Sequence, residues 1–416
     1  MNMWLTVADG GDVAGGDAAA PLGSWADPAD LPVRANLRAG TPYGAPQLSE
    51  PVRLNTNESP YPPSAELVND IAERVRTAAA ELHRYPDREA TALRADLSGY
   101  LGLISGVAVN PANVWPANGS SEILQQLLLV FGGHGRRALG FGPSYSMYRI
   151  IAEYLGTEWI EVPRAADFSL DAVDAVAAIA EHRPDIVFVT NPDSPSGRST
   201  DRDELEQIVR AAPGIVVVDE AYGEFSTTPT AIGLIDRFPT KLVVTRTLSK
   251  AFGFAGVRVG YLVAAPVIVD AVQLVRLPYH VSTISQVAAR AALAHTGEIL
   301  DNVAAVVRER ERVRTGLREL GFEVFGSAGN FLLFGRFTDA SRAWLRFLDH
   351  DVLIRDVGTP QHLRVTIGTR AENERFLEVC AEIGDQRYGL LGSGGAIPAS
   401  SSTRVLGGPS LRTSRL

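Results

Sequence analysis

Short, strongly apolar runs alternate with helical patterns through the middle of this 416-residue chain. Three of these runs, DIVFVT (185–190), GIVVVDE (214–220) and KLVVTRT (241–247), are rich in β-branched residues and too short for surface helices. Turn residues and a helical pattern follow each run. Strands that alternate with helices in this way favour a parallel sheet that is covered by helices on both faces. The sequence therefore predicts an α/β fold.

The amino-acid composition changes along the chain. At about 150 residues per domain, the length of the chain suggests two or three domains. Residues 1–30 and 389–416 are rich in small residues without apolar periodicity, so we expect a flexible N-terminal extension and a disordered tail. Between them we expect an N-terminal arm over 31–60, which contributes to a small domain, and a large α/β domain over 61–277. Residues 278–388 open with a long helical region and continue as short strands, which predicts a smaller α+β domain.

Composition and charge exclude several classes of protein. The net charge of −9 is spread along the chain, which argues against a nucleic-acid partner. No apolar run reaches the roughly 18 residues that cross a bilayer, and the N-terminal stretch lacks the basic and apolar regions of a secretory signal. Cys380 is the only cysteine, which excludes an internal disulfide and a multi-cysteine metal site. We therefore expect a protein of the reducing cytoplasm that uses no metal and no membrane.

In open α/β sheets, ligands bind at the carboxyl ends of the strands, and charged residues follow two of the predicted strands. Asp219 ends the strand in GIVVVDE, and Ser249 and Lys250 follow the strand in KLVVTRT. The ANGSSE stretch precedes a helix whose free N–H groups predict an anion site. These groups belong to Gly119, Ser120 and Ser121. Together the three features predict a ligand with an anion, a group that needs a carboxylate and a group that reacts with an amine.

Lys250 is one of only two lysines in the chain, the other being Lys241, so chemistry that needs a lysine has two candidates. Arginine stays protonated, whereas a desolvated lysine near other cations loses its proton and forms a Schiff base with a carbonyl. Pyridoxal phosphate carries a phosphate, a pyridine nitrogen and an aldehyde, which match the three features. Plainer explanations exist: a lysine after a strand is usually a solvated charge, as we expect for Lys241, and Asp219 and the Gly-Ser-Ser start are both suited to simple helix capping.

Longer motifs extend from the predicted arm to the C-terminal part of the chain. They are LNTNESPYPPS, RYPDREATALRADL, ANGSSE, PSYSMY, VVVDEAYGEF, RTLSKAFGFAGVRVGY, NFLLFGRF, VLIRD and LRVTIGT. On these motifs the chain resembles the fold-type I pyridoxal-phosphate aminotransferases and, within them, the histidinol-phosphate aminotransferases. The likeness covers residues 31–387, and RTLSKAFGFAG and VDEAY are its most specific parts. The resemblance implies a large domain with a mostly parallel central sheet flanked by helices, and a smaller α+β C-terminal domain.

The resemblance also implies a role for each residue that matches a family motif. Lys250 is expected to bind the cofactor aldehyde as a Schiff base, Asp219 to pair with the pyridinium nitrogen, and Tyr222 to bond the ring hydroxyl. The cofactor phosphate is expected to be held by Gly119, Ser120, Ser121, Ser249 and Arg258. Tyr145 is expected to stack on the ring, and Tyr85 to reach the cofactor phosphate of the neighbouring subunit in a homodimer with shared sites. A core tyrosine and a turn tyrosine are the plain alternatives for these two.

Substrate binding is implied for Tyr43, Asn57, Arg355 and Arg364. A phosphorylated amino donor and a dicarboxylate acceptor both need bidentate anion binding, which guanidinium groups supply. Asn57 and its neighbour Glu58 also suit a simple turn. The reaction that the resemblance implies is the transamination of L-histidinol phosphate with 2-oxoglutarate, which gives imidazole acetol phosphate and L-glutamate in histidine biosynthesis.

One loop departs from the family pattern. Family members usually carry Asn-Asn-Pro-Thr-Gly or a near variant, in which the asparagine before the proline binds the ring hydroxyl. The stretch NPDSPSG places Ser194 at that position, and the shorter serine would bond the cofactor only through a water, or not at all. Asn191 offers an alternative if the loop follows another path. The interval between Arg355 and Arg364 is also short, which predicts a differently shaped pocket for the substrate phosphate.

Other functions remain open at the level of sequence. The nearest is an aromatic amino-acid aminotransferase or a specialised paralogue with the same cofactor, followed by an enzyme like threonine-phosphate decarboxylase. A non-catalytic binding protein of the same fold is opposed by the joint presence of Lys250, Asp219, Tyr222 and Arg258. Dinucleotide binding is excluded, because no G-x-G-x-x-G motif opens the first strand-to-helix turn.

Overall fold

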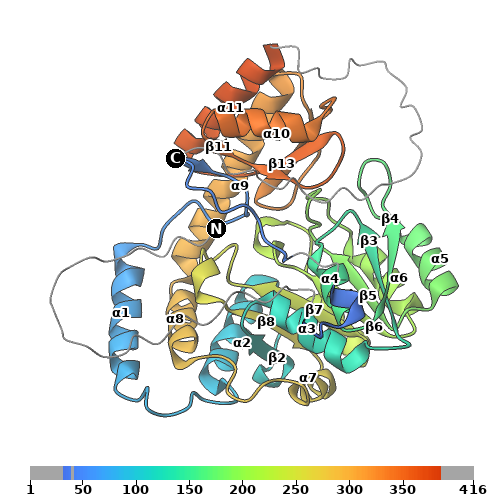
Figure 1. Ribbon diagram of the computed structural model, residues 1–416. Helices are drawn as coiled ribbons and strands as arrows, with labels where there is room; N and C mark the ends of the chain where they lie inside the picture. Colours follow the sequence, from blue (N-terminus) through green and yellow to red (C-terminus); the bar gives the residue numbers. More distant parts are fainter. Residues whose placement is uncertain (1–30, 39–41, 386–416) are drawn as a thin grey trace, which may run out of the picture. The chain divides into compact units, whose positions relative to one another are not determined.

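The computed structural model describes residues 31–38 and 42–385 of the chain (Figure 1). The flexible extension and the disordered tail that we predict over 1–30 and 389–416 lie outside the described residues. No helix in the described part of the chain combines the length and the apolar character needed to cross a membrane.

The chain separates into two units, Met1–Pro42 and Tyr43–Leu416. The described residues of the first unit form a short 3-10 helix, η2, over Ala35–Leu37. Every other element of the described residues belongs to the second unit, and the predicted arm over 31–60 spans the border between the two. The domain boundaries that the sequence suggests at residues 60, 277 and 388 stay predictions.

A seven-stranded sheet in the order β2-β8-β7-β6-β5-β3-β4 forms the centre of the second unit. Its strands are β2 Val114–Ala117, β3 Arg137–Gly142, β4 Glu158–Pro163, β5 Ile186–Thr190, β6 Ile215–Asp219, β7 Leu242–Thr247 and β8 Gly260–Ala264. Strands β4, β3, β5, β6 and β7 pair in parallel, whereas β8 pairs antiparallel with both β7 and β2. The predicted mostly parallel sheet is confirmed, and the three apolar runs form β5, β6 and β7.

Helices cover both faces of this sheet. Successive strand residues point to opposite sides, so apolar strands present side chains to both faces that helices must bury. Val187 and Val216 belong to the apolar cluster on one face, and Phe188 and Val217 to the cluster on the other. The first face is covered by α2 Thr91–Ser105, α5 Ala172–His182 and α6 Arg202–Ala211. The second face is covered by α3 Ser120–Phe131, α4 Met147–Tyr154 and α7 Pro266–Gln273. This double cover explains the apolar residues of β5, β6 and the first half of β7, residues 242–244.

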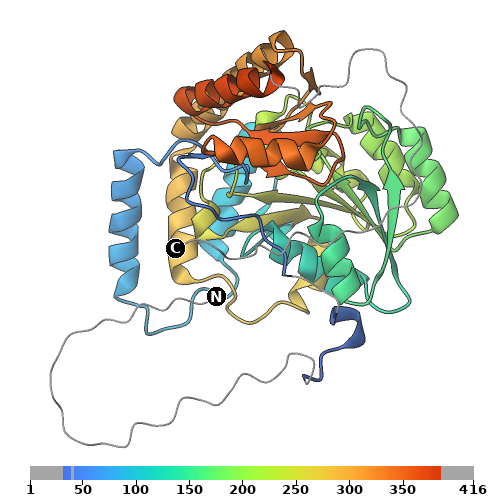
Figure 2. The same cartoon turned by 45° about the horizontal axis from the view of Figure 1, so that its top comes forward.

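The long helical pattern that begins the predicted small domain is broken in the structure. Helix α8 (Thr283–Ala294) lies beside α1 (Ala65–Ala79) in both ribbon views, and α9 (Thr296–Glu319) starts a new direction (Figures 1 and 2). Between them His295 leaves the helical backbone range, with φ −102° and ψ 27°, and its Nε2 lies 3.3 Å from Asp70 Oδ2 of α1. A tertiary contact accompanies the break, and Gly297, two residues after His295, is the only nearby helix-weakening residue in the sequence.

The C-terminal part forms a smaller α+β assembly (Figure 2). An antiparallel sheet in the order β12-β13-β10-β9 consists of β9 Glu323–Val324, β10 Phe331–Gly335, β12 Arg355–Asp356 and β13 His362–Thr366. It is accompanied by helices α10 Ala340–Asp349 and α11 Arg370–Asp385. Arm residues join this part, because β1 Val52–Arg53 pairs in parallel with β11 Val352–Leu353.

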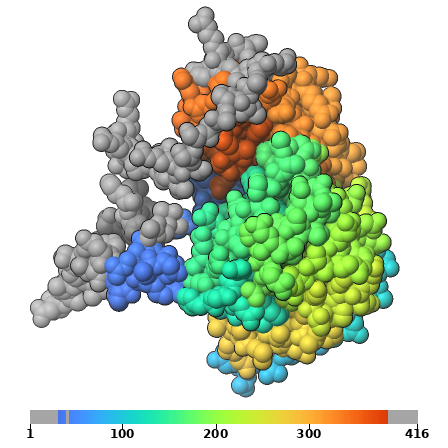
Figure 3. All heavy atoms as spheres, turned by 90° about the vertical axis from the view of Figure 1, so that its right-hand side faces the viewer, coloured from blue at the N-terminus to red at the C-terminus, as the bar shows by residue number. Residues whose placement is uncertain are grey.

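The two parts of the second unit are in direct contact. In the space-filling view the orange and red C-terminal residues lie against green residues of the large sheet domain (Figure 3). The N–H of Ala328 donates to Gly197 O over 2.8 Å, which joins the small domain to the loop after β5. This contact brings the small domain close to the carboxyl edge of the central sheet.

Candidate active site

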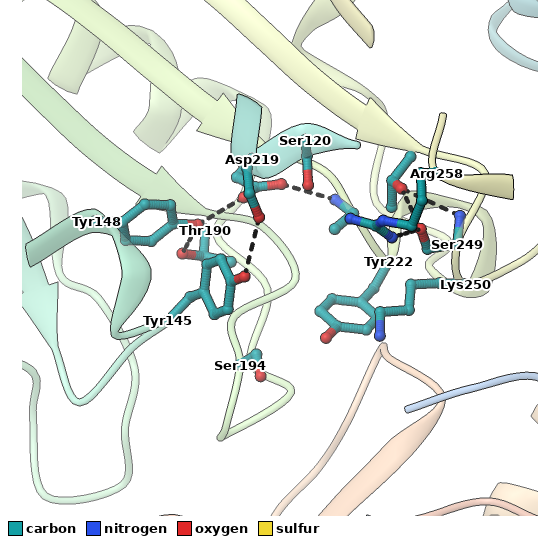
Figure 4. A pocket seen from close by; sticks show the side chains of 13 residues that line it. Ser120, Tyr145, Tyr148, Thr190, Ser194, Asp219, Tyr222, Ser249, Lys250 and Arg258 are labelled. Atoms are coloured by element: carbon teal, nitrogen blue, oxygen red, sulfur yellow. Dashed lines mark hydrogen bonds between the residues drawn. The ribbon is translucent and has the colours of Figure 1, made fainter. Parts of the chain in front are cut away.

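A cavity of about 140 Å³ lies at the carboxyl ends of β5, β6 and β7, the edge where the sequence predicts a ligand (Figure 4). Nine of the eleven residues that we predict to bind a cofactor line it: Ser120, Ser121, Tyr145, Ser194, Asp219, Tyr222, Ser249, Lys250 and Arg258. The lining is completed by Tyr148, Thr190, Ala221 and Thr247. Gly119 and Tyr85 are not part of the lining.

Lys250 follows β7 and extends toward the cavity (Figure 4). Its Nζ donates a hydrogen bond of 2.8 Å to the backbone oxygen of Thr56. Burial and the guanidinium of Arg364 lower the pKa of Lys250 from 10.5 to about 8, against a smaller opposing effect of Glu58. At pH 7 about one amine in ten is then neutral, compared with fewer than about one in a thousand for an ordinary lysine. The neutral amine is the form that attacks a carbonyl.

Asp219 ends β6, and the sheet register places it between Thr190 of β5 and Thr245 of β7. Its carboxylate accepts hydrogen bonds from the Tyr148 hydroxyl at 2.7 Å and from the Ala221 N–H at 3.1 Å. Burial raises the pKa of Asp219, and both hydrogen bonds oppose that rise. The arrangement presents a buried carboxylate to the cavity, which suits a cationic group of a ligand.

The N-terminus of α3 and the side chain of Arg258 together form a site for an anion. Gly119 has a φ of +87°, and a Cβ at this position would lie 2.5 Å from Arg258 Nη2, so a glycine is needed for the guanidinium to reach the helix. Arg258 Nη1 donates to Ser249 Oγ over 3.3 Å. Free N–H groups at the start of α3, including that of Ser120, a guanidinium and a hydroxyl are the groups that bind phosphate.

Asn57 connects the arm to both domains. Its Nδ2 donates to the hydroxyl of Tyr222 over 2.9 Å, and its N–H donates to Thr366 Oγ1 over 3.0 Å. Asn330 Nδ2 donates to Asn57 O over 3.1 Å. Asn57 lines neither the first cavity nor the adjoining one described next, so the structure places it behind Tyr222.

A second cavity of about 140 Å³ adjoins the first, and Tyr145 and Ser194 line both. Three of the four residues predicted to bind a substrate line it, namely Tyr43, Arg355 and Arg364. Arg355 of β12 is the direct cross-strand partner of Arg364 of β13, so their short interval in the sequence reflects two neighbouring antiparallel strands. Burial lowers the pKa of Arg364, and Arg355 adds to that effect. Two adjacent guanidinium groups suit a ligand that carries strong anions.

Ser194 lies where the two cavities meet. Its Oγ accepts a hydrogen bond of 3.1 Å from Arg364 Nη1. Asn191, the alternative to Ser194, is engaged elsewhere, because its side chain binds the backbone N–H and oxygen of Thr200 at 2.9 and 3.0 Å. The loop therefore brings Ser194 rather than Asn191 to the cavity.

Known proteins of one enzyme family match nearly the whole of this fold. Residues 49–379 match the family model of the class I and II aminotransferases. A histidinol-phosphate aminotransferase of Nocardia farcinica is 65% identical over 350 residues, which cover 84% of this chain and 91% of that protein. Another, from Mycolicibacterium smegmatis, is 59% identical over 356 residues, which cover 85% and 94%. The chain belongs to the histidinol-phosphate aminotransferases.

A solved member of this family has the same fold. The histidinol-phosphate aminotransferase of Sinorhizobium meliloti, determined in complex with pyridoxal-5'-phosphate, matches with a TM-score of 0.72 and 26% identity. The match covers 80% of this chain and 91% of that one. The family and the fold class that the motifs predicted are both confirmed.

Tyr85, which in this family is expected to reach a neighbouring subunit, lies on the surface. Its side chain is 79% exposed and stacks on Tyr279, with ring centroids 4.4 Å apart and planes 12° from parallel. Leu82 and Leu277, which are close to this pair in sequence, are exposed as well. Large exposed apolar side chains are typical of a surface that another protein covers. The role of Tyr85 at a partner's site stays a prediction.

Four residues that line the cavity are not among those predicted from the sequence. Thr190 and Thr247 end β5 and β7 at the edge where Asp219 ends β6, so the strand-end rule finds them once it includes uncharged polar residues. Tyr148 lies in the PSYSMY motif, but no spacing rule connects it with Asp219, which follows 71 residues later. Ala221 contributes only small apolar surface.

Proposed function

We propose that this chain transfers the amino group of L-histidinol phosphate to 2-oxoglutarate with pyridoxal phosphate as cofactor, giving imidazole acetol phosphate and L-glutamate. The observation that carries the proposal is the meeting of Lys250, Asp219 and the anion site of Arg258 at one edge of the sheet, beside a pair of arginines. The names of relatives 55–65% identical to this chain support the same reaction.

The cavity fits this cofactor at three points. Lys250, whose pKa is lowered to about 8, provides an amine for the aldehyde. Asp219 forms no ion pair with any residue that the structure describes, so its buried carboxylate is free to pair with a protonated ring nitrogen. Because Gly119 has no Cβ, the guanidinium of Arg258 fits beside it and can bind a phosphate at the start of α3. The residues present therefore match the three functional groups of pyridoxal phosphate.

When bound, pyridoxal phosphate supplies an electron-withdrawing ring that stabilises negative charge on the carbon bearing the substrate amine. Lys250 would hold the cofactor through its amine, and its Nζ, once free, would be the base for the proton on that carbon. Asp219 keeps a proton on the ring nitrogen by placing a negative charge beside it. Tyr222 would donate to the ring hydroxyl, and Tyr145, which lines the same cavity, would pack on the ring face.

The second cavity is the site for the anionic ends of both substrates. Arg355 and Arg364 provide bidentate donors for the phosphate of the amino donor and for the carboxylates of the acceptor. Tyr43, which is 49% exposed, adds a hydroxyl at the same cavity. Asn57 contributes indirectly by orienting Tyr222 through a bond of 2.9 Å.

The test is a single-turnover experiment on the purified enzyme. L-histidinol phosphate and phenylalanine are each mixed with it, and the visible absorption of the bound cofactor is followed. We expect histidinol phosphate to react faster and at lower concentration. Preference for phenylalanine would instead identify an aromatic amino-acid aminotransferase, and release of carbon dioxide from threonine phosphate would identify a decarboxylase. Absence of reaction with every amine would identify a binding protein.

The covalent role of Lys250 has its own test, for which the second lysine is a matched control. Lys250→Ala is expected to abolish turnover in a folded protein. Lys241→Ala is expected to retain turnover, because the Nζ of Lys241 donates to the backbone oxygen of Ala212 at 2.6 Å and lines neither cavity. Borohydride reduction followed by digestion and mass spectrometry should find the cofactor on the peptide that contains Lys250. An unmodified peptide would contradict the role.

We further propose that the protein works as a homodimer in the cytoplasm, with Tyr85 of each subunit at the partner's site. The exposed stack of Tyr85 on Tyr279 and the family resemblance support the dimer, and the lone Cys380 fits a reducing compartment. Mixing inactive Lys250→Ala with Tyr85→Ala is expected to restore activity, because each mixed dimer then contains one intact site. No recovery after subunit exchange would contradict the shared site.

A further inference from the structure

A chain of hydrogen bonds links Asp219 to a second buried carboxylate, Asp193, and Figure 4 shows the part next to the cavity. The Tyr148 hydroxyl donates to Asp219 Oδ2 over 2.7 Å and lies 2.9 Å from Thr190 Oγ1. Thr190 Oγ1 lies 2.9 Å from Ser144 Oγ, which donates to Asp193 Oδ1 over 2.9 Å. Three hydroxyl groups thus connect the carboxylate at the end of β6 with the loop after β5.

Three buried carboxylates lie at this edge of the sheet, and they differ in their partners. Asp193 pairs with Arg164 at 3.2 Å, and Glu220 pairs with Arg246 at 2.6 Å. Asp219 has no such cation among the described residues, so hydrogen bonds alone stabilise its charge within the protein. A buried carboxylate without a counter-ion depends strongly on each donor that it keeps.

The number of available protons sets the direction of the hydrogen bonds. An ionised carboxylate only accepts, so Tyr148 donates its single proton to Asp219 and Ser144 donates its proton to Asp193. Thr190 then has one proton for two neighbours, Tyr148 and Ser144. When Thr190 donates to Tyr148, it polarises that hydroxyl and strengthens the bond to Asp219.

Packing fixes the ring of Tyr148 independently of its hydroxyl. The side chain is fully buried, its ring stacks on Phe188 at 4.9 Å, and it meets the edge of Tyr145 at 5.4 Å. A phenylalanine at this position keeps these contacts and removes only the donor. Thr190 retains Ser144 as an acceptor in that variant, so the loss is confined to Asp219.

We propose that Tyr148 is a positioning residue for Asp219: its hydroxyl, supported by Thr190, keeps the carboxylate ionised and directed at the ring nitrogen of the cofactor. The inference rests on the proposed function, in which Asp219 pairs with that nitrogen. It assigns to Tyr148 a role that acts through Asp219 rather than through contact with the substrate.

Titratable groups surround Asp219 on every neighbouring element. They are Tyr145 and Tyr148 from α4 and the loop before it, Glu220 and Tyr222 after β6, and Lys250 and Arg258 after β7, which line the same cavity. Burial raises the pKa of Asp219, and the bond from Tyr148 lowers it. Removal of that bond therefore raises the pKa of Asp219, so that its protonated form, which cannot pair with a protonated nitrogen, persists to higher pH.

The test measures cofactor binding rather than turnover. Full-length wild type, Tyr148→Phe and the control Tyr154→Phe, which removes a hydroxyl from the end of the same helix, are dialysed against a series of pyridoxal phosphate concentrations at several pH values. Tyr148→Phe is expected to bind about ten- to a hundredfold more weakly, the range for one hydrogen bond to a charged group. The acid side of its pH–affinity profile is expected to move to higher pH, while Tyr154→Phe matches wild type.

Two results would overturn the inference. The first is wild-type affinity in Tyr148→Phe, and the second is a uniform loss at all pH values, which would indicate packing alone. A double-mutant cycle sharpens the distinction, because Tyr148→Phe should have no further effect in an Asp219→Asn background. Further weakening of the same size in that background would equally contradict a role through the carboxylate.

Thr190→Val removes the hydroxyl that donates to the Tyr148 hydroxyl. This variant also keeps the inference testable if Tyr148→Phe does not fold. It leaves the Tyr148–Asp219 bond in place, so a smaller shift of the acid side in the same direction is expected. An unchanged profile would contradict the support from Thr190. Failure of the cofactor role of Lys250, on which the inference rests, is a separate result, since wild type itself would then show no pyridoxal phosphate attached to Lys250.

Discussion

Replacing Lys250 with methionine is expected to stabilise the cofactor-free protein while it abolishes turnover. Methionine matches the apolar stem of the lysine as far as Cε, lacks the terminal amine and carries no charge. At pH 7 the folded wild type holds an ammonium group at a position that lowers its pKa from 10.5 to about 8. The unfolded chain exposes the same group to water and meets no such penalty. The reactivity of Lys250 therefore comes at the expense of folded stability.

The magnitude follows from two contributions. The pKa difference of Lys250 corresponds to at most about 3.5 kcal/mol at ~1.4 kcal/mol per pKa unit. Loss of the 2.8 Å hydrogen bond from the Lys250 Nζ to Thr56 O offsets about 1 kcal/mol of this gain in stability. The net gain expected for Lys250→Met at pH 7 is at most about 2.5 kcal/mol. Because the folded pKa lies below the unfolded one, the wild-type penalty is complete below pH 8 and fades toward pH 10.5, so the gain shrinks in that window.

The assay is urea unfolding of dialysed protein at one fixed protein concentration, followed by far-UV circular dichroism at about pH 7 and about pH 9.5. Lys241→Met is the control, since it removes only a bond to Ala212 O and is not expected to raise stability. The reasoning is refuted if Lys250→Met unfolds at the same or lower urea concentration than wild type near pH 7. A gain that stays constant at the higher pH would refute the attribution to the amine.

Three further predictions concern the cavity walls. Gly119→Ala is expected to weaken cofactor binding about tenfold or more in equilibrium dialysis, because its Cβ would meet Arg258 at 2.5 Å, whereas Gly102→Ala, with its nearest contact at 3.8 Å, leaves binding unchanged. Arg364→Gln should raise the KM for 2-oxoglutarate about a hundredfold with a smaller change in kcat, and an unchanged KM in steady-state assays would remove it from the substrate site. Ser194→Asn is expected to tighten cofactor binding about threefold to tenfold by adding a donor for the ring hydroxyl, and weaker binding would show that this cavity requires serine.

Much of the candidate site is visible in the sequence for a local reason. A strand that is buried on both faces is mostly apolar, so a charged residue at its end or just after it stands out, as Asp219 and Lys250 do. Parallel strands also end at one edge, which is why the sequence alone suffices to place residues from separate strands together. The same reasoning applied to hydroxyl side chains would have included Thr190.

Other features depend on contacts between segments that are distant in the sequence. Tyr148 meets Asp219 across 71 residues, and Asn57 meets Tyr222 across 165. The sequence likewise allows two paths for the loop that presents Ser194 to the cavity, and the bonds between the Asn191 side chain and Thr200 decide between them.

Local patterns alone establish the order of the elements, the mostly parallel sheet and the edge at which its chemistry lies, because burial, turn formation and strand alternation act over a few neighbouring residues. The folded arrangement decides which hydroxyl serves Asp219, which residue of the loop faces the cavity and how far the pKa of Lys250 falls. These properties arise from desolvation and from charges on other elements, such as Arg364, which act through space and leave no trace in the spacing of residues along the chain.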